Sequence, residues 1–436
     1  MNTSWKAGTA RANITPAEPL WLAGYGGRDR PAEGTLQPVW AKALALEDAG
    51  GRRGVVLTTD LCGLSRGSCD RVRELLRRST GLTTAEIFLT STHNHCSPVT
   101  SDSLVDYYPL DGAVWDGVHR YTRRVEEQLA EIAGAAVSSC EPVTLHAGTG
   151  HADFAVNRRN NREADVPDLR AAGTPLAGPV DHRVPLLTAR RRNGSLLALL
   201  FGYACHPTTL SFYQICGDYP GFAQEALEAR HPGATALFWT GCGGDQNPLP
   251  RRSMELCRAY GARLAAGVDD ALNGALRPLA SELRTAFVTV PLPFEGMPGR
   301  TELQDAGETG SAIRKRWAAR LLARLARGEA LETEYPYPLQ AWRLGDQLWF
   351  GLGAEAVVDY ALRAQREFGP DTWTCGYAHE LIAYIPSRRV WDEGGYEGGN
   401  LYEYGLPAER WSGDVEERIW AGVHAVTARV ERTSGV

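Results

Sequence analysis

The sequence predicts an α/β fold in which mixed β-sheets are flanked by helices. Apolar runs of strand length recur along the chain and are separated by segments with helical periodicity. A helical segment at residues 69–78 lies between apolar runs at residues 54–60 and 86–91, which is the order of a strand–helix–strand unit. Asn193-Gly194 separates two further apolar runs and is a strong hairpin signal. Parallel and antiparallel pairing are therefore both expected.

Further elements of the first half follow from the same periodicity. Strands are expected at residues 41–47, 143–147, 184–188, 196–202 and 235–240. Helices are expected at residues 117–136 and 221–230. The loop at residues 98–115 is long, and such loops usually belong to a binding site or to disorder. Its tyrosines favour a binding site.

The second half continues the alternation of helices and strands. Helices are expected at residues 254–272, 311–327, 356–368 and 413–432. Strands are expected at residues 281–292, and a hairpin joins residues 341–343 to residues 348–351. No internal repeat and no clear linker divides the chain, so one domain over residues 1–436 is expected.

Composition excludes several classes of protein. The chain has 436 residues, of which 43% are hydrophobic and 22% charged, as in ordinary globular proteins. Its net charge of -6 has no basic stripe, so nucleic acid is not expected as a partner. No apolar run reaches the roughly 18 residues of a membrane span, and no stable membrane association is expected. The first residues lack a signal peptide's apolar core and the nine cysteines are scattered, so we expect reduced thiols and a cytoplasmic location.

Histidines and a glutamate follow three of the predicted strands. His93 and His95 come after the apolar run that ends at residue 91 and, if they continue that strand, point to the same side of it. His206 follows the strand at residues 196–202, and Glu355 follows the strand at residues 348–351. Two imidazoles and a carboxylate are a common ligand set for catalytic zinc, although iron and manganese also accept it.

A glycine-rich turn follows the strand at residues 235–240. Its three glycines at residues 241–244 let the backbone approach a ligand or a metal site closely. No Lys-Ser/Thr pair follows, which argues against a nucleotide-binding loop.

Several segments resemble, in the same order, the zinc-binding catalytic domain of the neutral/alkaline non-lysosomal ceramidases. They are Ile14-Thr15-Pro16 with Gly24-Tyr25, the strand from Ala41 to Asp48, Thr92-His93-Asn94-His95, Asn157-Arg158, His206-Pro207-Thr208, Gly353-Ala354-Glu355, and Tyr384 with Tyr396 before Glu397-Gly398-Gly399. The resemblance spans most of the chain and implies a ceramidase-like catalytic domain.

The resemblance implies roles for individual residues. The zinc ligands would be His93, His206, Glu355 and Tyr384, and the other active-site groups would be His95, Arg158 and Tyr396. Each has a structural alternative. Tyr384 could be a buried tyrosine with a satisfied hydroxyl, His95 a loop histidine and Arg158 a surface arginine.

Two departures from the family pattern limit what carries over. The family's glycine-rich turn reads Gly-Asp-x-Ser-Pro with an active-site serine, whereas Asn247 occupies that position here. An amide cannot act as a serine-type nucleophile but can orient water or substrate. Asp245 would either orient a ligand histidine or cap the turn. The chain also ends where the family continues into an immunoglobulin-like domain, so we expect neither that domain nor activity on membrane ceramide.

The first functional hypothesis is a zinc-dependent hydrolase that cleaves an amide bond of a small soluble substrate. Arg158 would bind a carboxylate or another anionic group of that substrate. The alternative, suggested by Asn247, is ester or lactone hydrolysis, or an intramolecular condensation or cyclisation in secondary metabolism. The third is a non-catalytic metal-binding protein. The full set of seven active-site side chains argues against it, because a decayed site usually loses its ligands first.

Overall fold

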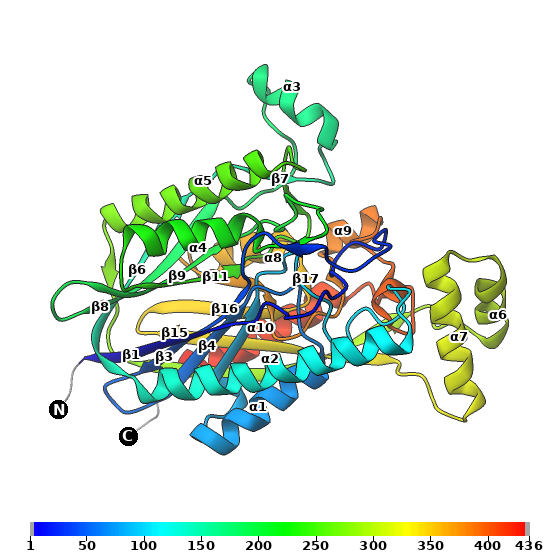
Figure 1. The fold of residues 1–436 in the computed structure, drawn as a ribbon, viewed down its shortest axis with the longest axis horizontal. Helices are drawn as coiled ribbons and strands as arrows, with labels where there is room; N and C mark the ends of the chain where they lie inside the picture. Colours follow the sequence, from blue (N-terminus) through cyan, green and yellow to red (C-terminus); the bar gives the residue numbers. More distant parts are fainter. Residues whose placement is uncertain (1–3, 432–436) are drawn as a thin grey trace.

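The computed structural model describes residues 4–431, and its main feature is one mixed sheet (Figure 1). Met1–Thr3 and residues 432–436 lie outside the described part, including the last residue of the predicted C-terminal helix. The order of the strands is β11-β9-β8-β6-β1-β3-β4-β5-β18-β16-β15-β14-β20, and β13 pairs with β6. This architecture confirms the predicted α/β class with a mixed sheet.

The strands of this sheet are β1 (Trp5–Asn13), β3 (Trp40–Glu47), β4 (Arg53–Thr59), β5 (Ile87–Ser91), β6 (Glu141–His151), β8 (Arg183–Arg191), β9 (Leu196–Tyr203), β11 (Thr235–Thr240), β13 (Arg277–Pro278), β14 (Leu283–Glu295), β15 (Glu334–Leu344), β16 (Gln347–Gly353), β18 (Trp373–Ala378) and β20 (Arg410–Trp411). Short two-stranded pairings join β2 (Gly34–Thr35) to β10 (Gln214–Ile215), β7 (Ala155–Asn157) to β12 (Gln246–Pro248), and β17 (Glu355–Ala356) to β19 (Tyr384–Ile385).

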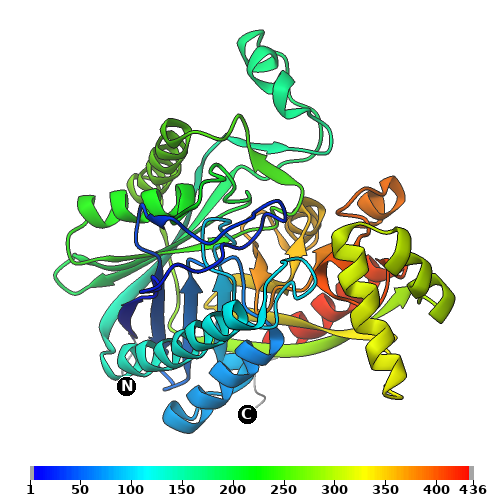
Figure 2. The same ribbon diagram turned by 45° about the vertical axis from the view of Figure 1, so that its right-hand side comes forward.

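The helices are α1 (Arg66–Thr80), α2 (Gly112–Ser138), α3 (Val166–Ala171), α4 (Asp218–Arg230), α5 (Met254–Asn273), α6 (Arg300–Thr309), α7 (Ala312–Ala326), α8 (Val358–Phe368), α9 (Arg388–Glu393) and α10 (Val415–Glu431). Helices α1 and α2 lie along the β1–β3–β4 region, α4 and α5 along β6, β8 and β11, and α10 against β14 and β15 (Figures 1 and 2). Helix α3 and the α6–α7 pair project from the body (Figure 2). Within residues 4–431, no helix combines the length and the apolar character that a membrane-spanning segment requires.

Three parallel strand pairs determine where a site can form. The pairs β4/β5, β9/β11 and β16/β18 are each joined through a helix, namely α1, α4 and α8. Their carboxyl ends meet, because Ala378 at the end of β18 pairs with Thr90 near the end of β5, and Gly241 after β11 bridges to Cys375 in β18. Ligands usually bind at the carboxyl ends of parallel strands. The topology therefore brings three such ends to one place.

A tryptophan-rich core fills the interior beneath these ends. Phe88 stacks on Trp349 with ring centroids 4.0 Å apart, and Trp239, Trp342 and Trp373 pack edge-on or tilted around Trp349. All five side chains are buried. Rigid aromatic packing of this kind fixes the strand ends that carry the polar residues.

The sequence pattern missed helix α6 and misplaced two histidines. Helix α6 was not expected, because it carries only one buried residue, Leu303, and so lacks a clear apolar stripe. Strand β5 ends at Ser91, and His93 has a left-handed backbone with φ 59°. His93 and His95 thus do not lie on a strand, and their common direction comes from a turn.

We expect Gly376→Ala to destabilise the junction between the strand ends. An added Cβ at Gly376 would lie 2.7 Å from Cys242 Cα and 2.8 Å from Gly241 O, which the backbone can relieve only by moving. The free energy of unfolding should fall by about 1–3 kcal/mol in denaturant titrations. The control is Gly134→Ala in α2, where no atom lies within 4 Å of the added Cβ. It should be neutral or stabilising by up to about 1 kcal/mol, and equal effects of the two changes would contradict the expectation.

Candidate metal centre

Three predicted ligands meet at the strand ends. Glu355 Oε2 lies 3.1 Å from His93 Nε2 and 3.0 Å from His206 Nε2. All three side chains are buried, and their ligand atoms lie within 4.8 Å of one another. Residues far apart in the sequence are therefore brought together as a group that can hold a metal ion.

The local backbone explains how these side chains reach one another. His93 follows β5, His206 follows β9, and Glu355 begins β17 directly after β16. His93 and Ala354 both have left-handed backbones, with φ values of 59° and 69°. Such conformations cost non-glycine residues roughly 1–2 kcal/mol, and they concentrate at functional sites. Strain is thus located at one ligand of the cluster, His93, and at the residue that precedes another, Glu355.

Backbone carbonyls fix which ring nitrogen of each histidine carries a proton. His93 Nδ1 lies 2.7 Å from Cys62 O, and His206 Nδ1 lies 2.6 Å from Gly243 O. A carbonyl can only accept, so both Nδ1 atoms carry hydrogen, and in the neutral rings the lone pairs are on Nε2. Both Nε2 atoms face a carboxylate oxygen, and His93 Nε2 also lies 3.1 Å from His95 Nε2. Either a proton on His93 Nε2 or a metal ion can join these facing atoms.

The spacing of the donor atoms suits zinc. Ligands about 2.0–2.1 Å from a tetrahedral ion lie roughly 3.3 Å from one another. The distances of 3.0 and 3.1 Å to Glu355 are close to this value. The Tyr384 hydroxyl lies 3.4 Å from His206 Nε2, so this predicted fourth ligand is also within reach. A second possible group, of Cys62, His93 and His95, needs the same histidines.

The charges in the cluster favour an ionised Glu355 beside a positively charged His93. Burial by itself would raise the pKa of Glu355, but His93 and His206 hold it well below its usual value. Burial opposes protonation of His93, yet Glu355 raises the pKa of His93 well above its ordinary value. Burial, helped by Arg158, lowers the pKa of His206 to about 4. Glu355 is therefore ionised and His206 neutral, as metal binding needs, and a metal ion would take the place of the proton on His93.

His95 lies beside the cluster in a recess formed by Gly24 and Tyr25. A Cβ at Gly24 would lie 2.3 Å from the His95 ring, and the Tyr25 ring packs against it edge-on at 4.8 Å. Burial, with the neighbouring His93, lowers the pKa of His95 well below its ordinary value. His95 Nδ1 is buried and has no partner in the described part of the chain. His95 is therefore held as a neutral ring beside the cluster.

Arg158 is not the free anion-binding group that the sequence suggested. Its Nε donates to Glu397, its Nη1 to Asn247 Oδ1, and its Nη2 to Gly244 O and the Tyr384 hydroxyl. The side chain is 13% exposed. Because protein acceptors occupy the guanidinium fork, Arg158 positions Asn247 and Tyr384 and has little left for a substrate carboxylate.

Asn247 is oriented by its neighbours. Arg158 Nη1 lies 3.0 Å from Asn247 Oδ1, and Thr208 Oγ1 donates to the same oxygen at 3.3 Å. Arginine can only donate, so the atom facing it must be Oδ1. The Nδ2 group is then left as a donor on the cavity side, since Asn247 lines the cavity beside the cluster.

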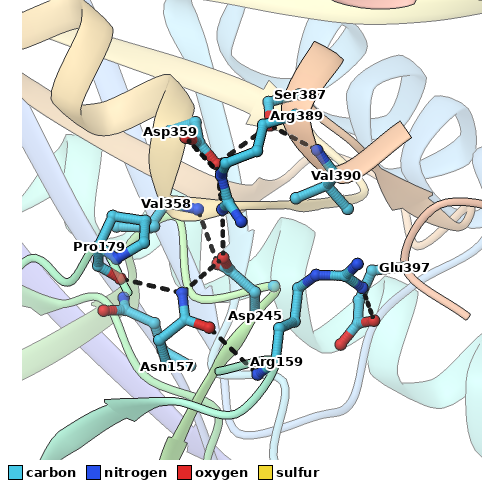
Figure 3. A network of polar contacts seen from close by, with 12 residues as sticks. Asn157, Arg159, Pro179, Asp245, Val358, Asp359, Ser387, Arg389, Val390 and Glu397 are labelled. Carbon is cyan, nitrogen blue, oxygen red and sulfur yellow. Dashed lines mark hydrogen bonds and ion pairs between the residues drawn. The ribbon is translucent and has the colours of Figure 1, made fainter. Parts of the chain in front are cut away.

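Asp245 does not orient a ligand histidine. Its carboxylate accepts from Asn157 Nδ2 at 3.0 Å and from the Val358 N–H at 2.9 Å, and it faces Arg389 Nη2 at 3.4 Å (Figure 3). Val358 is the first residue of α8, whose initial N–H groups lack helical partners. Burial raises the pKa of Asp245 to about 6. Asp245 therefore caps α8 and supports the Asn157 loop, while the Gly243 and Cys62 carbonyls orient the histidines.

A cavity of about 210 Å³ opens onto the cluster. The predicted binding loop contributes Leu104 and Tyr107, and it is held by an ion pair between Arg320 of α7 and Asp106. Tyr396 lies at the cavity mouth, is 44% exposed, and contacts the Tyr384 ring edge-on. The cavity thus connects the cluster to solvent past Tyr396.

Sequence reasoning missed three side chains that surround the cluster. Tyr404 donates to Glu355 Oε1 at 2.9 Å and so orients the carboxylate. Tyr377 lies over the His93 ring, and its hydroxyl is 3.3 Å from His206 Nδ1. Cys62 lines the cavity. Cys62 and Tyr377 follow or end strands that meet here, which is a usable signal, whereas nothing local distinguishes Tyr404.

We expect Arg158→Gln to destabilise the protein, because it removes a buried cation from Glu397 and takes a donor away from both Gly244 O and Asn247 Oδ1. Breaking a buried pair in this way typically costs about 3 kcal/mol, measured by chemical denaturation. Arg162→Gln is the matched control, since Arg162 is 84% exposed and should change stability by less than about 0.5 kcal/mol. An Arg158 variant as stable as the control would restore the simple substrate-binding role.

The chain is similar to proteins of known family and fold. A family model described as neutral/alkaline non-lysosomal ceramidase, N-terminal, matches residues 5–247. The crystal structure of neutral ceramidase from Pseudomonas aeruginosa is similar with a TM-score of 0.74 and 20% identity, covering 100% of this chain and 76% of that one. A ceramidase structure described as complexed with C2 gives 0.74 and 19%, covering 100% and 77%. No curated protein matches the chain.

Proposed function

We propose, because the chain belongs to the neutral/alkaline non-lysosomal ceramidase family, that it is a zinc-dependent hydrolase that cleaves an amide bond of a small substrate. The observation that carries the proposal is the convergence of the Nε2 atoms of His93 and His206 on one oxygen of Glu355, with all three ligand atoms within 4.8 Å of one another. This arrangement favours a bound metal ion, and Tyr384 would complete a four-ligand set.

Zinc bound by these side chains would supply a Lewis acid and a lowered pKa of water. The protein's own groups would do the rest. Tyr404 holds Glu355 in place through Oε1, which leaves Oε2 directed at the histidines. His95, kept neutral by burial, would accept a proton from the attacking water and return it to the leaving amine. Neutral imidazole in a buried site suits such a transfer.

Asn247 and Tyr396 would act on the substrate's carbonyl oxygen. Asn247 Nδ2 is held as a donor on the cavity side and would stabilise negative charge that develops there. The Tyr396 hydroxyl at the mouth would contribute a second donor. A cavity of about 210 Å³ favours a small molecule as the binding partner. This agrees with the expectation that the protein binds neither nucleic acid nor a membrane. We propose the cytoplasm as its location.

Asn247 also favours a second candidate function. Because no serine nucleophile stands at this position, the same centre could hydrolyse an ester or lactone, or catalyse an intramolecular condensation or cyclisation in a biosynthetic route. The mass of the product separates these reactions, since hydrolysis adds water and condensation removes it. A non-catalytic metal-binding protein is the remaining alternative, and it would give no product.

We expect about one zinc ion per purified chain by elemental mass spectrometry, and its loss in a His206→Ala, Glu355→Ala double variant. A chelator should lower the melting temperature, and added zinc should restore it, because a ligand of the folded state stabilises that state. Glu403→Gln is the matched control, since Glu403 lines the cavity outside the cluster. Metal-free wild-type protein that also fails to bind added zinc would overturn the proposed centre.

We expect the zinc-loaded protein to release amine from members of a panel of short N-acyl compounds, and His93→Ala to abolish the release with the fold intact. Removal of a metal ligand takes away the chemistry that no other group supplies. Amine release and product mass are measured together, with ester and lactone analogues in parallel. Full activity in His93→Ala would exclude this mechanism.

A further inference from the structure

One wall of the cavity carries two adjacent arginines that the proposed mechanism does not use. Arg251 lines the cavity and is 15% exposed. Its Nε pairs with Glu163 at 2.9 Å, and its Nη1 donates to Thr208 Oγ1 at 3.3 Å. Of the five N–H groups of a guanidinium, the others have no acceptor among residues 4–431. Arg251 therefore keeps donors for a ligand.

Arg252 is directed into the same cavity mouth by an unusual backbone. Its φ of 87° is left-handed, a conformation that is rare for arginine and concentrates at functional sites. The guanidinium lies 5.2 Å from the Tyr25 ring and donates to the Tyr25 hydroxyl at 3.0 Å. No carboxylate in the described part of the chain pairs with it. Because Tyr25 packs on His95, Arg252 lies one ring away from the metal cluster.

The other arginines nearby are already neutralised or solvated. A second cavity of about 350 Å³ shares Arg158, Asn247, Arg251 and Tyr396 with the first, and four arginines but only two glutamates line it. Arg158 and Arg159 are both bound to Glu397. Guanidinium donors without a protein acceptor therefore remain on Arg251, which is paired with Glu163 through Nε only, and on Arg252, which has no carboxylate partner among the described residues.

We propose that Arg251 and Arg252 bind a carboxylate of the substrate, so that the substrate is an N-acyl amino acid or a similar short-chain amide of an amino acid. The proposal rests on the function proposed above and assigns to these residues the role that the sequence suggested for Arg158. Guanidinium groups match the two oxygens of a carboxylate. The acyl group would lie against the apolar lining residues Leu104, Leu381 and Tyr107.

The size of the cavity restricts the acyl group. Cavities for drug-sized ligands usually measure about 300–1,000 Å³, and the inner cavity measures about 210 Å³. An acyl chain of a few carbons fits there, while the wider arginine-lined cavity accommodates the amino-acid part. We therefore expect a substrate that has a short apolar acyl group at one end and a carboxylate at the other.

The test uses zinc-loaded full-length protein and matched probes. N-acetyl and N-butanoyl amino acids are each compared with their C-terminal carboxamides, which lack only the negative charge. Binding is measured by calorimetry and hydrolysis by amine release. We expect the acids to bind about tenfold to hundredfold more tightly, as charge-assisted hydrogen bonds imply. Arg251→Gln and Arg252→Gln should each reduce this ratio toward one, and Arg252→Lys should give an intermediate value.

The controls separate this proposal from the proposed function. Arg192→Gln, an exposed arginine in the β8–β9 turn, should keep the wild-type ratio. If Arg251→Gln unfolds, the binding ratio of acids to carboxamides is measured in the variants of the exposed Arg252 alone. Acids that bind at these arginines without being hydrolysed would support the carboxylate site and count against amide hydrolysis. Equal binding of acids and carboxamides, or a preference that persists in both arginine variants because the acid binds the metal, would overturn the carboxylate site.

Discussion

The contact on which the site depends is that of two imidazole nitrogens with one carboxylate oxygen. Cys62 O and Gly243 O bind the protons on the Nδ1 atoms of His93 and His206, so both Nε2 atoms are directed at Glu355. Glu355 stays ionised, because its pKa is held low. A positive charge, either a proton on His93 or a metal ion, balances the carboxylate. The three converging strand ends and the packed tryptophans below them hold these groups together.

Around this centre, buried arginines link residues of the site to one another. Arg158 joins the glycine-rich turn to Tyr384 and Glu397, and Arg159 joins the same glutamate to the start of the Arg158 loop. Guanidinium groups suit this work because several donors lie in one plane. The positive charges that remain available stand at the mouth of the cavity. Arg158 and Arg159 thus stabilise the site, while other arginines remain available to bind a ligand.

Sequence patterns predicted the fold class and placed three candidate ligands at strand ends, whereas the resemblance to the ceramidase family joined them into one cluster. His93, His206 and Glu355 each follow an apolar run, and parallel strands bring such positions together. The pattern gave an incorrect reason for His93, since the strand stops at Ser91 and a left-handed turn aims the ring. A sequence does not show which hydrogen-bond partners surround a side chain. Arg158 was therefore assigned to the substrate, and Asp245 was left open between a histidine and the following turn, whereas Asn247 and Tyr384 bind Arg158 and the start of α8 binds Asp245. Tyr404 reaches Glu355 across the fold and leaves no local signal.

The fixed amide of Asn247 has a consequence for the time course of turnover. A serine at this place would offer an oxygen that can bond to the substrate, and an intermediate of that kind accumulates as an early burst of product. Asn247 Oδ1 is bound by Arg158 and Thr208, and its nitrogen is not a nucleophile. This residue therefore cannot carry an acyl group between two half-reactions. Water would attack the substrate directly, both products would form in the same step, and product release would start without a lag or a burst.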